Sequence, residues 1–343
     1  MTARRKLVVT VVVGAVLLAG AFVGVVLATS GSSDDELVVY SARSHYGEEQ
    51  PFRDFAKQQD EDLTLFGGGA SELYERLQSE GDKTKADVLI TVDAANLWRA
   101  KQAGLLEPLS SKILAADVPD DLRDPDNQWF GLTTRARTIM RSNDRVRPDD
   151  VTTYAGLADP RWKGKLCLRT ATSEYNVSFV ADRIAKDGQA ATEKLLRGWM
   201  ANEPTILGSD KDVLDAIAKG NCDVGLTNTY YLGRELDANP NYPVSPVFAD
   251  QGGRGTHVNL SGYAVLKNSD RKAEAQQLVE YLAQPDEQKV FADNNFEYPV
   301  APGVEPADVI ARFGTFKRDP IDVDGAGEHL DDALQLMQQV GWN

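Results

Sequence analysis

The sequence contains few of the residues from which common metal and nucleophile sites are built. Among 343 residues there are two cysteines and three histidines. Two thiols without histidines at ligand spacing cannot form a zinc site. The phosphate-binding glycine patterns GxxxxGK[ST] and GxGxxG are absent, as are the catalytic patterns GxSxG and HExxH. These absences argue against a zinc protein, a nucleotide-dependent enzyme and the commonest hydrolases.

Positive charge is also scarce relative to negative charge. The chain has 37 Lys and Arg against 52 Asp and Glu, which gives a formal net charge of -15. Three of the basic residues, Arg4, Arg5 and Lys6, lie together at the N-terminus. Nucleic-acid binding needs basic patches that neutralise phosphates, so we exclude nucleic acid as a partner.

Long apolar runs are absent except at the N-terminus. The basic residues there precede an apolar run from Leu7 to Ala28, which approaches the ~20 residues that span a bilayer. No cysteine lies near its end, so lipid modification is excluded. Residues 1–33 therefore predict a signal peptide or a membrane anchor with a short linker, and residues 34–343 are expected outside the cytoplasm.

The two cysteines lie in segments that we expect to be strands of one lobe. Cys167 lies within 165–168 and Cys222 begins 222–225. An even number of cysteines in an exported protein predicts a disulfide between them.

Strand-like and helix-like segments alternate along the chain. A first series has strands at 37–41, 63–66 and 86–91, and a second has strands at 166–169, 205–207 and 222–226. Helices are expected at 71–77, 94–103, 177–187, 191–199, 212–219, 271–283 and 285–294. Such alternation predicts parallel α/β sheets with right-handed crossovers.

Two further strand-like runs, 127–140 and 257–266, fit neither series and are expected to cross between two lobes. The predicted fold is therefore α/β, with two lobes, two hinge-crossing strands and a cleft between the lobes. We expect lobe 1 to comprise 34–135 plus 259–302, and lobe 2 to comprise 136–258 plus 303–343.

Tyrosines follow several of the predicted strands. Tyr230 and Tyr231 lie where a strand passes into a helix, and loops after other strands carry His45, Tyr46 and Tyr175. Ligands of open α/β sheets bind outside the carboxyl ends of the strands, where helix N-termini favour anions such as phenolate. Phenolate is a hard ligand of the kind that Fe(III) selects. Tyrosines that only pack the lobe surfaces are the alternative.

Six stretches resemble the ferric-binding proteins of bacterial ABC iron importers, in the tyrosine-rich subgroup. They are 40–46, 86–90, 166–170, 222–231, 254–259 and 296–300, and the pair Tyr230-Tyr231 is their most specific mark. The resemblance implies a periplasmic-binding-protein ("Venus flytrap") fold in which phenolates hold Fe(III). It places metal ligands at Tyr46, Tyr175, Tyr230 and Tyr231.

The resemblance also implies roles for two residues near Tyr46. His45 falls on a position where a histidine either binds the metal or lies beside it, and the additional residue Ser44 leaves its direction open. Arg43 falls where a cation balances phenolate charge or holds a small anion such as carbonate. Arg137 is a second candidate for balancing this charge.

The function implied is an exported, monomeric Fe(III) receptor that is not an enzyme and delivers iron to a membrane permease. One alternative keeps the fold but binds a small organic cation, such as a polyamine or thiamine, through Asp93 and Trp98. Another is an exported hydrolase that uses carboxylates such as Glu72 and Asp93.

Overall fold

A computed structural model describes residues 36–46 and 49–343 of the chain. The predicted targeting segment, 1–33, lies outside these residues. Within the described ranges, no helix is both long enough and apolar enough to cross a membrane.

A mixed sheet runs through the whole molecule, in the strand order β2-β1-β3-β9-β4-β7-β5-β6. On one side lie β2 (Leu63–Gly67), β1 (Leu37–Ser41) and β3 (Val88–Thr91), and on the other β7 (Val224–Asn228), β5 (Leu166–Arg169) and β6 (Thr205–Leu207). Each set of three is parallel, as the alternation of strands and helices predicts.

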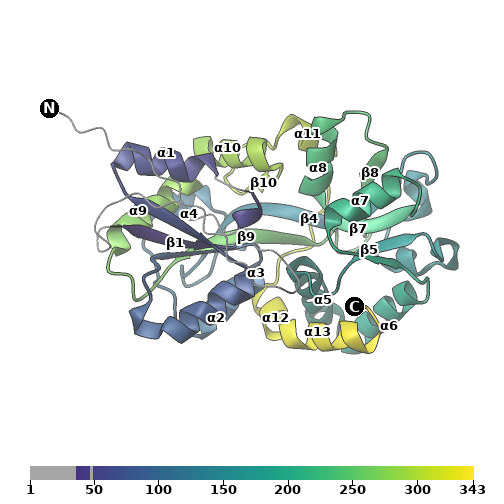
Figure 1. Ribbon diagram of the computed structural model, residues 1–343, viewed down its shortest axis with the longest axis horizontal. Helices are drawn as coiled ribbons and strands as arrows, with labels where there is room; N and C mark the ends of the chain where they lie inside the picture. Colours follow the sequence, from purple (N-terminus) through teal and green to yellow (C-terminus); the bar gives the residue numbers. More distant parts are fainter. Residues whose placement is uncertain (1–35, 47–48) are drawn as a thin grey trace, which may run out of the picture.

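Two antiparallel strands in the centre join the halves of the sheet. They are β4 (Phe130–Ser142) and β9 (Val258–Val265), and Figure 1 shows both running from one lobe towards the other. β4 pairs with β9 up to Ala136 and with β7 from Arg137 onward. The strand therefore changes lobes between these two residues. The short strands β8 (Val244–Val247) and β10 (Tyr298–Pro299) also pair with β4.

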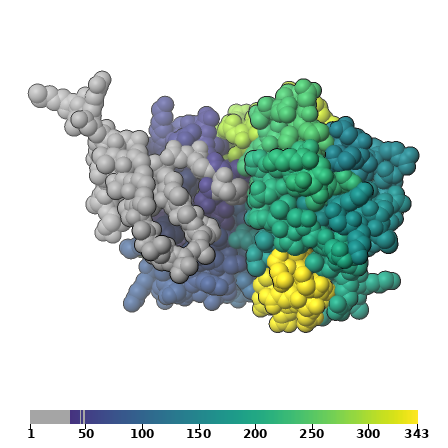
Figure 2. All heavy atoms as spheres, turned by 45° about the vertical axis from the view of Figure 1, so that its right-hand side comes forward, coloured from purple at the N-terminus to yellow at the C-terminus, as the bar shows by residue number. Residues whose placement is uncertain are grey.

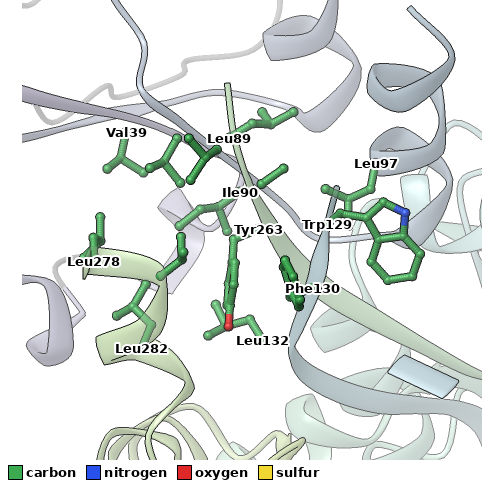
Figure 3. Close-up of a cluster of buried hydrophobic side chains, with 14 of the residues drawn as sticks. Val39, Leu89, Ile90, Leu97, Trp129, Phe130, Leu132, Tyr263, Leu278 and Leu282 are labelled. Carbon is green, nitrogen blue, oxygen red and sulfur yellow. The ribbon is translucent and has the colours of Figure 1, made fainter. Parts of the chain in front are cut away.

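The first lobe has its own apolar core around the buried strand β3. All four residues of β3 are buried, as is typical of a strand covered on both faces. Figure 3 shows Leu89 and Ile90 of β3 with Phe130, Tyr263 and Leu278 in one cluster. The covering helices are α1 (Gln50–Gln59), α2 (Ala70–Glu80), α3 (Ala94–Gln102), α4 (Lys112–Asp117), α9 (Lys272–Ala283) and α10 (Pro285–Asn295).

The second lobe packs its helices around a cluster of large aromatic side chains. Phe179 stacks on Trp199 at a centroid distance of 5.9 Å, and Trp199 also contacts Trp342 near the C-terminus. Its helices are α5 (Glu174–Asp187), α6 (Gln189–Met200), α7 (Asp210–Ala218) and α8 (Thr229–Ala238), and α11 (Asp308–Ala311) contacts α8. Short 3-10 helices in the chain are η1 (Ser44–Tyr46), η2 (Gly81–Lys83), η3 (Asp120–Leu122), η4 (Pro148–Asp150), η5 (Ala155–Ala158) and η6 (Pro160–Trp162).

The C-terminal helices α12 (Val323–Glu328) and α13 (Leu330–Gln339) both pack on α5. In Figure 2 this segment, in yellow, lies against the green and teal surface of the second lobe. α12 also touches α3 of the first lobe, where a Cβ on Gly327 would come within 2.4 Å of the Trp98 ring. Only a glycine permits this approach of the two lobes.

The structure confirms the predicted α/β fold with two lobes and two crossing strands. Some predicted boundaries were wrong. β7 continues to Asn228, two residues beyond the expected end, and α5 begins at Glu174 rather than 177. β8 was missed because it has only four residues and contains Pro246, and a proline within a segment argues against a strand. The limits of the lobes, including the placement of 303–343, stay a prediction.

The disulfide between Cys167 and Cys222 is confirmed. Cys167 lies in β5, and Cys222 lies two residues before β7, its parallel neighbour. The two Cα atoms are 5.9 Å apart, and both residues are buried. The bond therefore fixes the start of the strand that leads to Tyr230 and Tyr231.

We expect thiol titration of the unfolded, non-reduced protein to find no free cysteine. Because the bond closes a loop across a sequence separation of 55 residues, its removal in a Cys167→Ala/Cys222→Ala variant should destabilise the protein by ~4 kcal/mol in the chain-entropy model. Urea unfolding with and without reductant measures the effect. Two free thiols in the untreated protein would contradict the bridge.

Candidate metal centre

Four tyrosines from both lobes meet between the lobes. Tyr46 ends η1 in the first lobe, Tyr175 lies in the first turn of α5, and Tyr230 and Tyr231 lie in the first turn of α8. The Tyr230 hydroxyl donates a hydrogen bond of 3.0 Å to the Tyr175 hydroxyl. The Tyr230 ring centroid lies 5.8 Å from that of Tyr46 and 4.3 Å from that of Tyr231. The structure thus brings together the four tyrosines that the sequence singles out.

The tyrosines of the second lobe lie at the starts of two helices. β7 ends at Asn228 and α8 begins at the next residue, so Tyr230 and Tyr231 follow a buried strand immediately. Tyr175 was expected in a loop but lies in a helix, because α5 begins earlier than its apolar pattern indicates. The N-termini of both helices carry partial positive charge, which favours a phenolate at each.

Burial keeps these phenols protonated in the absence of a cation. It raises the pKa of Tyr46, Tyr175 and Tyr230 above the ordinary value. The charge of Glu297 raises the pKa of Tyr46 further, and neighbouring tyrosines raise that of Tyr230. The Arg135 guanidinium acts in the opposite direction on all three pKa values. A cation that coordinates the oxygens must therefore displace protons from buried phenols.

Arg43 does not offer free donors to an anion. Its Nε and Nη2 donate to Glu49, Nη2 also donates to Glu297 at 2.8 Å, and Nη1 donates to Ser261 and Thr133. Internal acceptors thus occupy these donors in this structure, and an anion contact of Arg43 stays a prediction. Its guanidinium carbon lies 4.4 Å from the Tyr46 ring centroid, so a role in charge balance stays a prediction. The side chain of His45 lies outside the described part of the chain.

Arg137, the second predicted source of positive charge, also forms an ion pair inside the protein. Its Nη1 lies 2.9 Å from Asp210 Oδ2, and both side chains are buried. The carboxylate cancels most of the charge that Arg137 would present to the tyrosines.

Three other arginines supply positive charge to the cluster. Arg135 is buried and donates to the Val92 carbonyl, while its Nε and Nη1 have no hydrogen-bond partner among the described residues. The Tyr175 ring centroid lies 5.7 Å from the Arg135 guanidinium carbon and 5.4 Å from that of Arg169. Nε and Nη1 of Arg169 likewise lack partners in the described ranges.

The third arginine, Arg234, lies one turn after the tyrosine pair on α8. Its guanidinium carbon is 4.7 Å from the Tyr46 ring centroid, 5.2 Å from that of Tyr230 and 5.7 Å from that of Tyr231. Arg234 therefore contacts tyrosines from both lobes. The spacing of Tyr230 and Arg234, four residues apart on a helix, is the sequence signal that points to this contact.

Direct contacts hold the lobes together at the cluster. The backbone N–H of Ala70, at the start of α2, donates a 2.9 Å hydrogen bond to Glu174 in the second lobe. Tyr175 packs within the apolar core of the first lobe. Burial and the neighbouring charge of Asp93 raise the pKa of Glu174 to about 7. The structure is thus a closed arrangement of the two lobes.

The residues of the alternative functions have structural roles. Asp93 caps α3 by accepting from the N–H of Asn96 at 2.9 Å, and Trp98 is covered by Gly327. Glu72 accepts from the N–H of Gly69 at the start of α2. Among the described residues no cluster of three or more His, Cys, Asp or Glu could hold a metal. Among the described residues, the four clustered tyrosines are therefore the candidate metal ligands.

Two lobes joined by two crossing strands, with converging side chains between them, define a hinged solute-binding protein. The chain belongs to the family described as bacterial extracellular solute-binding protein, which matches residues 51–318.

Several named relatives are iron uptake or ferric-binding proteins. The chain is 39% identical to iron uptake protein A1 of Synechocystis, over 97% of this chain and 95% of that protein. It is 42% identical to iron uptake protein A2 of the same organism, over 89% of each chain. Among solved structures, Trichodesmium IdiA (FutA) in complex with iron and citrate ligands matches with a TM-score of 0.82 and 40% identity, over 90% of this chain and all of that one. The ferric binding protein from Campylobacter jejuni matches with a TM-score of 0.85 and 34% identity, over 90% of this chain and 100% of that one.

The Arg43 network supports the position of Tyr46, so breaking it should destabilise the first lobe. Glu297→Ala leaves the buried Arg43 with one carboxylate fewer, and we expect a loss of about 3 kcal/mol in the free energy of unfolding. Urea unfolding measures it. Glu75→Ala, at an exposed position of α2, is the matched control and should change stability by less than ~0.5 kcal/mol. Equal effects of the two substitutions would refute the importance of the network.

Proposed function

We propose that this protein is an extracytoplasmic Fe(III) receptor that captures ferric iron between its lobes and delivers it to the permease of an ABC transporter. The observation that carries the proposal is the convergence of Tyr46, Tyr175, Tyr230 and Tyr231, with two of the phenol oxygens 3.0 Å apart. Oxygen atoms this close, on side chains from separate helices, can bind one ion together. The iron-related names of the relatives support the choice of metal.

The chemistry of phenols explains the selectivity for Fe(III). An ordinary tyrosine has a pKa of ~10, and burial raises it further here, so each phenolate that binds iron must first lose its proton. A trivalent ion provides the strong attraction that this step needs, whereas Fe(II), with less charge, binds more weakly. Proton release also makes ferric affinity fall as the pH falls. Reduction of the iron is then a sensible route for its release.

Positive side chains offset the charge of the phenolates. Four phenolates exceed the charge of Fe(III), and Arg135, Arg169 and Arg234 lie against their rings. If a small anion such as carbonate completes the coordination shell, Arg135 is the better partner for it than Arg43. Its Nε and Nη1 are buried and lack acceptors among the described residues. His45 remains a candidate ligand on the basis of the sequence.

The setting of the protein follows from its family and its N-terminus. An extracellular solute-binding protein is exported, and the apolar segment 7–28 would direct that export and, if uncleaved, anchor the protein in the membrane. Coordination of iron by the tyrosines converts no substrate into a product, so the proposed role is transport rather than catalysis. The protein acts as a monomer.

Removal of one phenolate oxygen should reveal its part in binding. Tyr230→Phe and Tyr231→Phe each leave packing nearly unchanged but should lower ferric affinity by orders of magnitude and shift or bleach the phenolate-to-iron charge-transfer band. Titration with ferric citrate in the visible range measures both quantities.

Tyr242→Phe is the control for these variants, because Tyr242 hydrogen-bonds to Asp215 rather than to a member of the cluster. It should bind iron like the wild type. Full affinity in the Tyr230→Phe/Tyr231→Phe protein would reject iron as the cargo.

Closure of the lobes should depend on Tyr46, the first-lobe member of the cluster. Iron held by the second lobe gains this ligand only when the lobes close, and that gain offsets the free-energy cost of closure. Small-angle scattering should show the wild type becoming more compact with iron, towards the closed structure described above. Tyr46→Phe should retain colour and compact less. An unchanged radius of gyration of the wild type would disprove closure, even if iron binds.

A further inference from the structure

A buried arginine links all the elements that carry the second-lobe tyrosines. Arg137 lies on β4 and is 2% exposed. Its Nε and Nη2 donate to Asn176 Oδ1 at 3.0 and 2.7 Å, and its Nη1 donates to Asp210 Oδ2 at 2.9 Å and to Asn228 Oδ1 at 3.0 Å. The guanidinium therefore bridges three acceptors that come from three different segments of the chain.

Each acceptor lies beside a tyrosine or fixes a residue that does. Asn176 follows Tyr175 directly and donates its side-chain amide to the carbonyls of Arg169 and Thr170, at the end of β5. Asn228 precedes Tyr230 by two residues and ends β7. Asp210, the first residue of α7, also accepts from the backbone N–H of Asn228 at 3.0 Å. One side chain thus sets the relative positions of the starts of α5 and α8.

The charge of Arg137 does not explain this arrangement. Asp210 is completely buried against it, so the pair is close to neutral as seen from the tyrosines. Replacing a buried ion pair by apolar residues is often neutral for stability, so stability alone does not require the pair. What the planar guanidinium adds is geometry, since it can donate in several fixed directions at once.

We propose that Arg137 is a positioning residue, which sets the spacing of the Tyr175 and Tyr230 hydroxyls for the metal through Asn176, Asp210 and Asn228. This inference rests on the proposed function. Partners of this kind, which orient the ligands without touching the metal, typically affect metal affinity by about 10- to 100-fold. The 3.0 Å contact between the two hydroxyls is the geometry that the network holds.

Arg137→Lys tests the proposal, because lysine keeps the charge beside Asp210 but cannot bridge the three acceptors. We expect ferric affinity to fall at least about tenfold and the charge-transfer band to shift, as the phenolates no longer meet the metal at the same distances. Competition with citrate measures the affinity, and visible absorbance measures the band. Loss of stability alone would not move the band of the folded, iron-loaded protein.

Arg145→Lys is the matched control. Arg145 donates to Asp223 at 2.6 Å, immediately before the first residue of β7. Arg137 instead donates to Asn228, the last residue of that strand. The control should keep the wild-type band and affinity. If Arg137→Lys folds and also keeps both, the network has only a structural role and the proposal is wrong.

A second variant covers the case in which Arg137→Lys does not fold. Asn176→Ala leaves the buried ion pair intact and removes the neutral hydrogen bonds that join Arg137 to the residue after Tyr175, together with those from Asn176 to the end of β5. It should lower affinity at least about tenfold and shift the band, and unchanged values would overturn the proposal. Failure of the wild type itself to bind iron is a separate outcome, since it would reject the proposed function as a whole.

Discussion

Burial of the tyrosine hydroxyls between the lobes is the constraint on which the centre depends. In water a phenol ionises only near pH 10, and here the closed lobes raise the pKa of Tyr46, Tyr175 and Tyr230 further. The closed cluster therefore carries little negative charge of its own. In the proposed function, it becomes a set of anionic ligands when a highly charged cation replaces the protons. That proposed exchange would connect the fold to selectivity, because a weakly charged ion attracts phenolates less strongly.

The central strand β4 connects the hinge with the chemistry. It changes pairing partners between Ala136 and Arg137, and two arginines flank that point on the same face of the strand. Arg135 keeps two buried donors without partners in the described chain, whereas Arg137 is fully engaged with Asp210 and two asparagines. One arginine thus has donors left for a ligand near the tyrosines, and the other is the proposed positioning residue.

The contacts between the lobes differ in how closely the residues pack. The Ala70–Glu174 hydrogen bond and the ring contact of Tyr46 with Tyr230 join the lobes only when these are closed. The packing of Gly327 on Trp98 is tighter and leaves no room for a side chain. α12 therefore contacts both α3 and α5 away from the tyrosines, whereas the contacts at the cluster are those that the proposed opening would break.

The sequence by itself determined the fold class and the disulfide, and it singled out the four tyrosines of the proposed site, because these depend on local patterns. Alternating strands and helices, cysteines in two segments predicted as strands, and an adjacent tyrosine pair after a strand are each recognised from short segments. Even the error over Tyr175 came from a helix start whose first residues lack an apolar pattern.

Only the tertiary structure decided which arginines lie against the tyrosine rings. Arg43 looked available in the sequence, but it is held by Glu297, which is 254 residues away along the chain. Arg135, Arg169 and Arg234 approach the tyrosine rings from β4, β5 and α8, and no local pattern marks that convergence. The partner of a buried charge is set by long-range packing, because desolvation forces each guanidinium towards whichever carboxylate the fold brings near it.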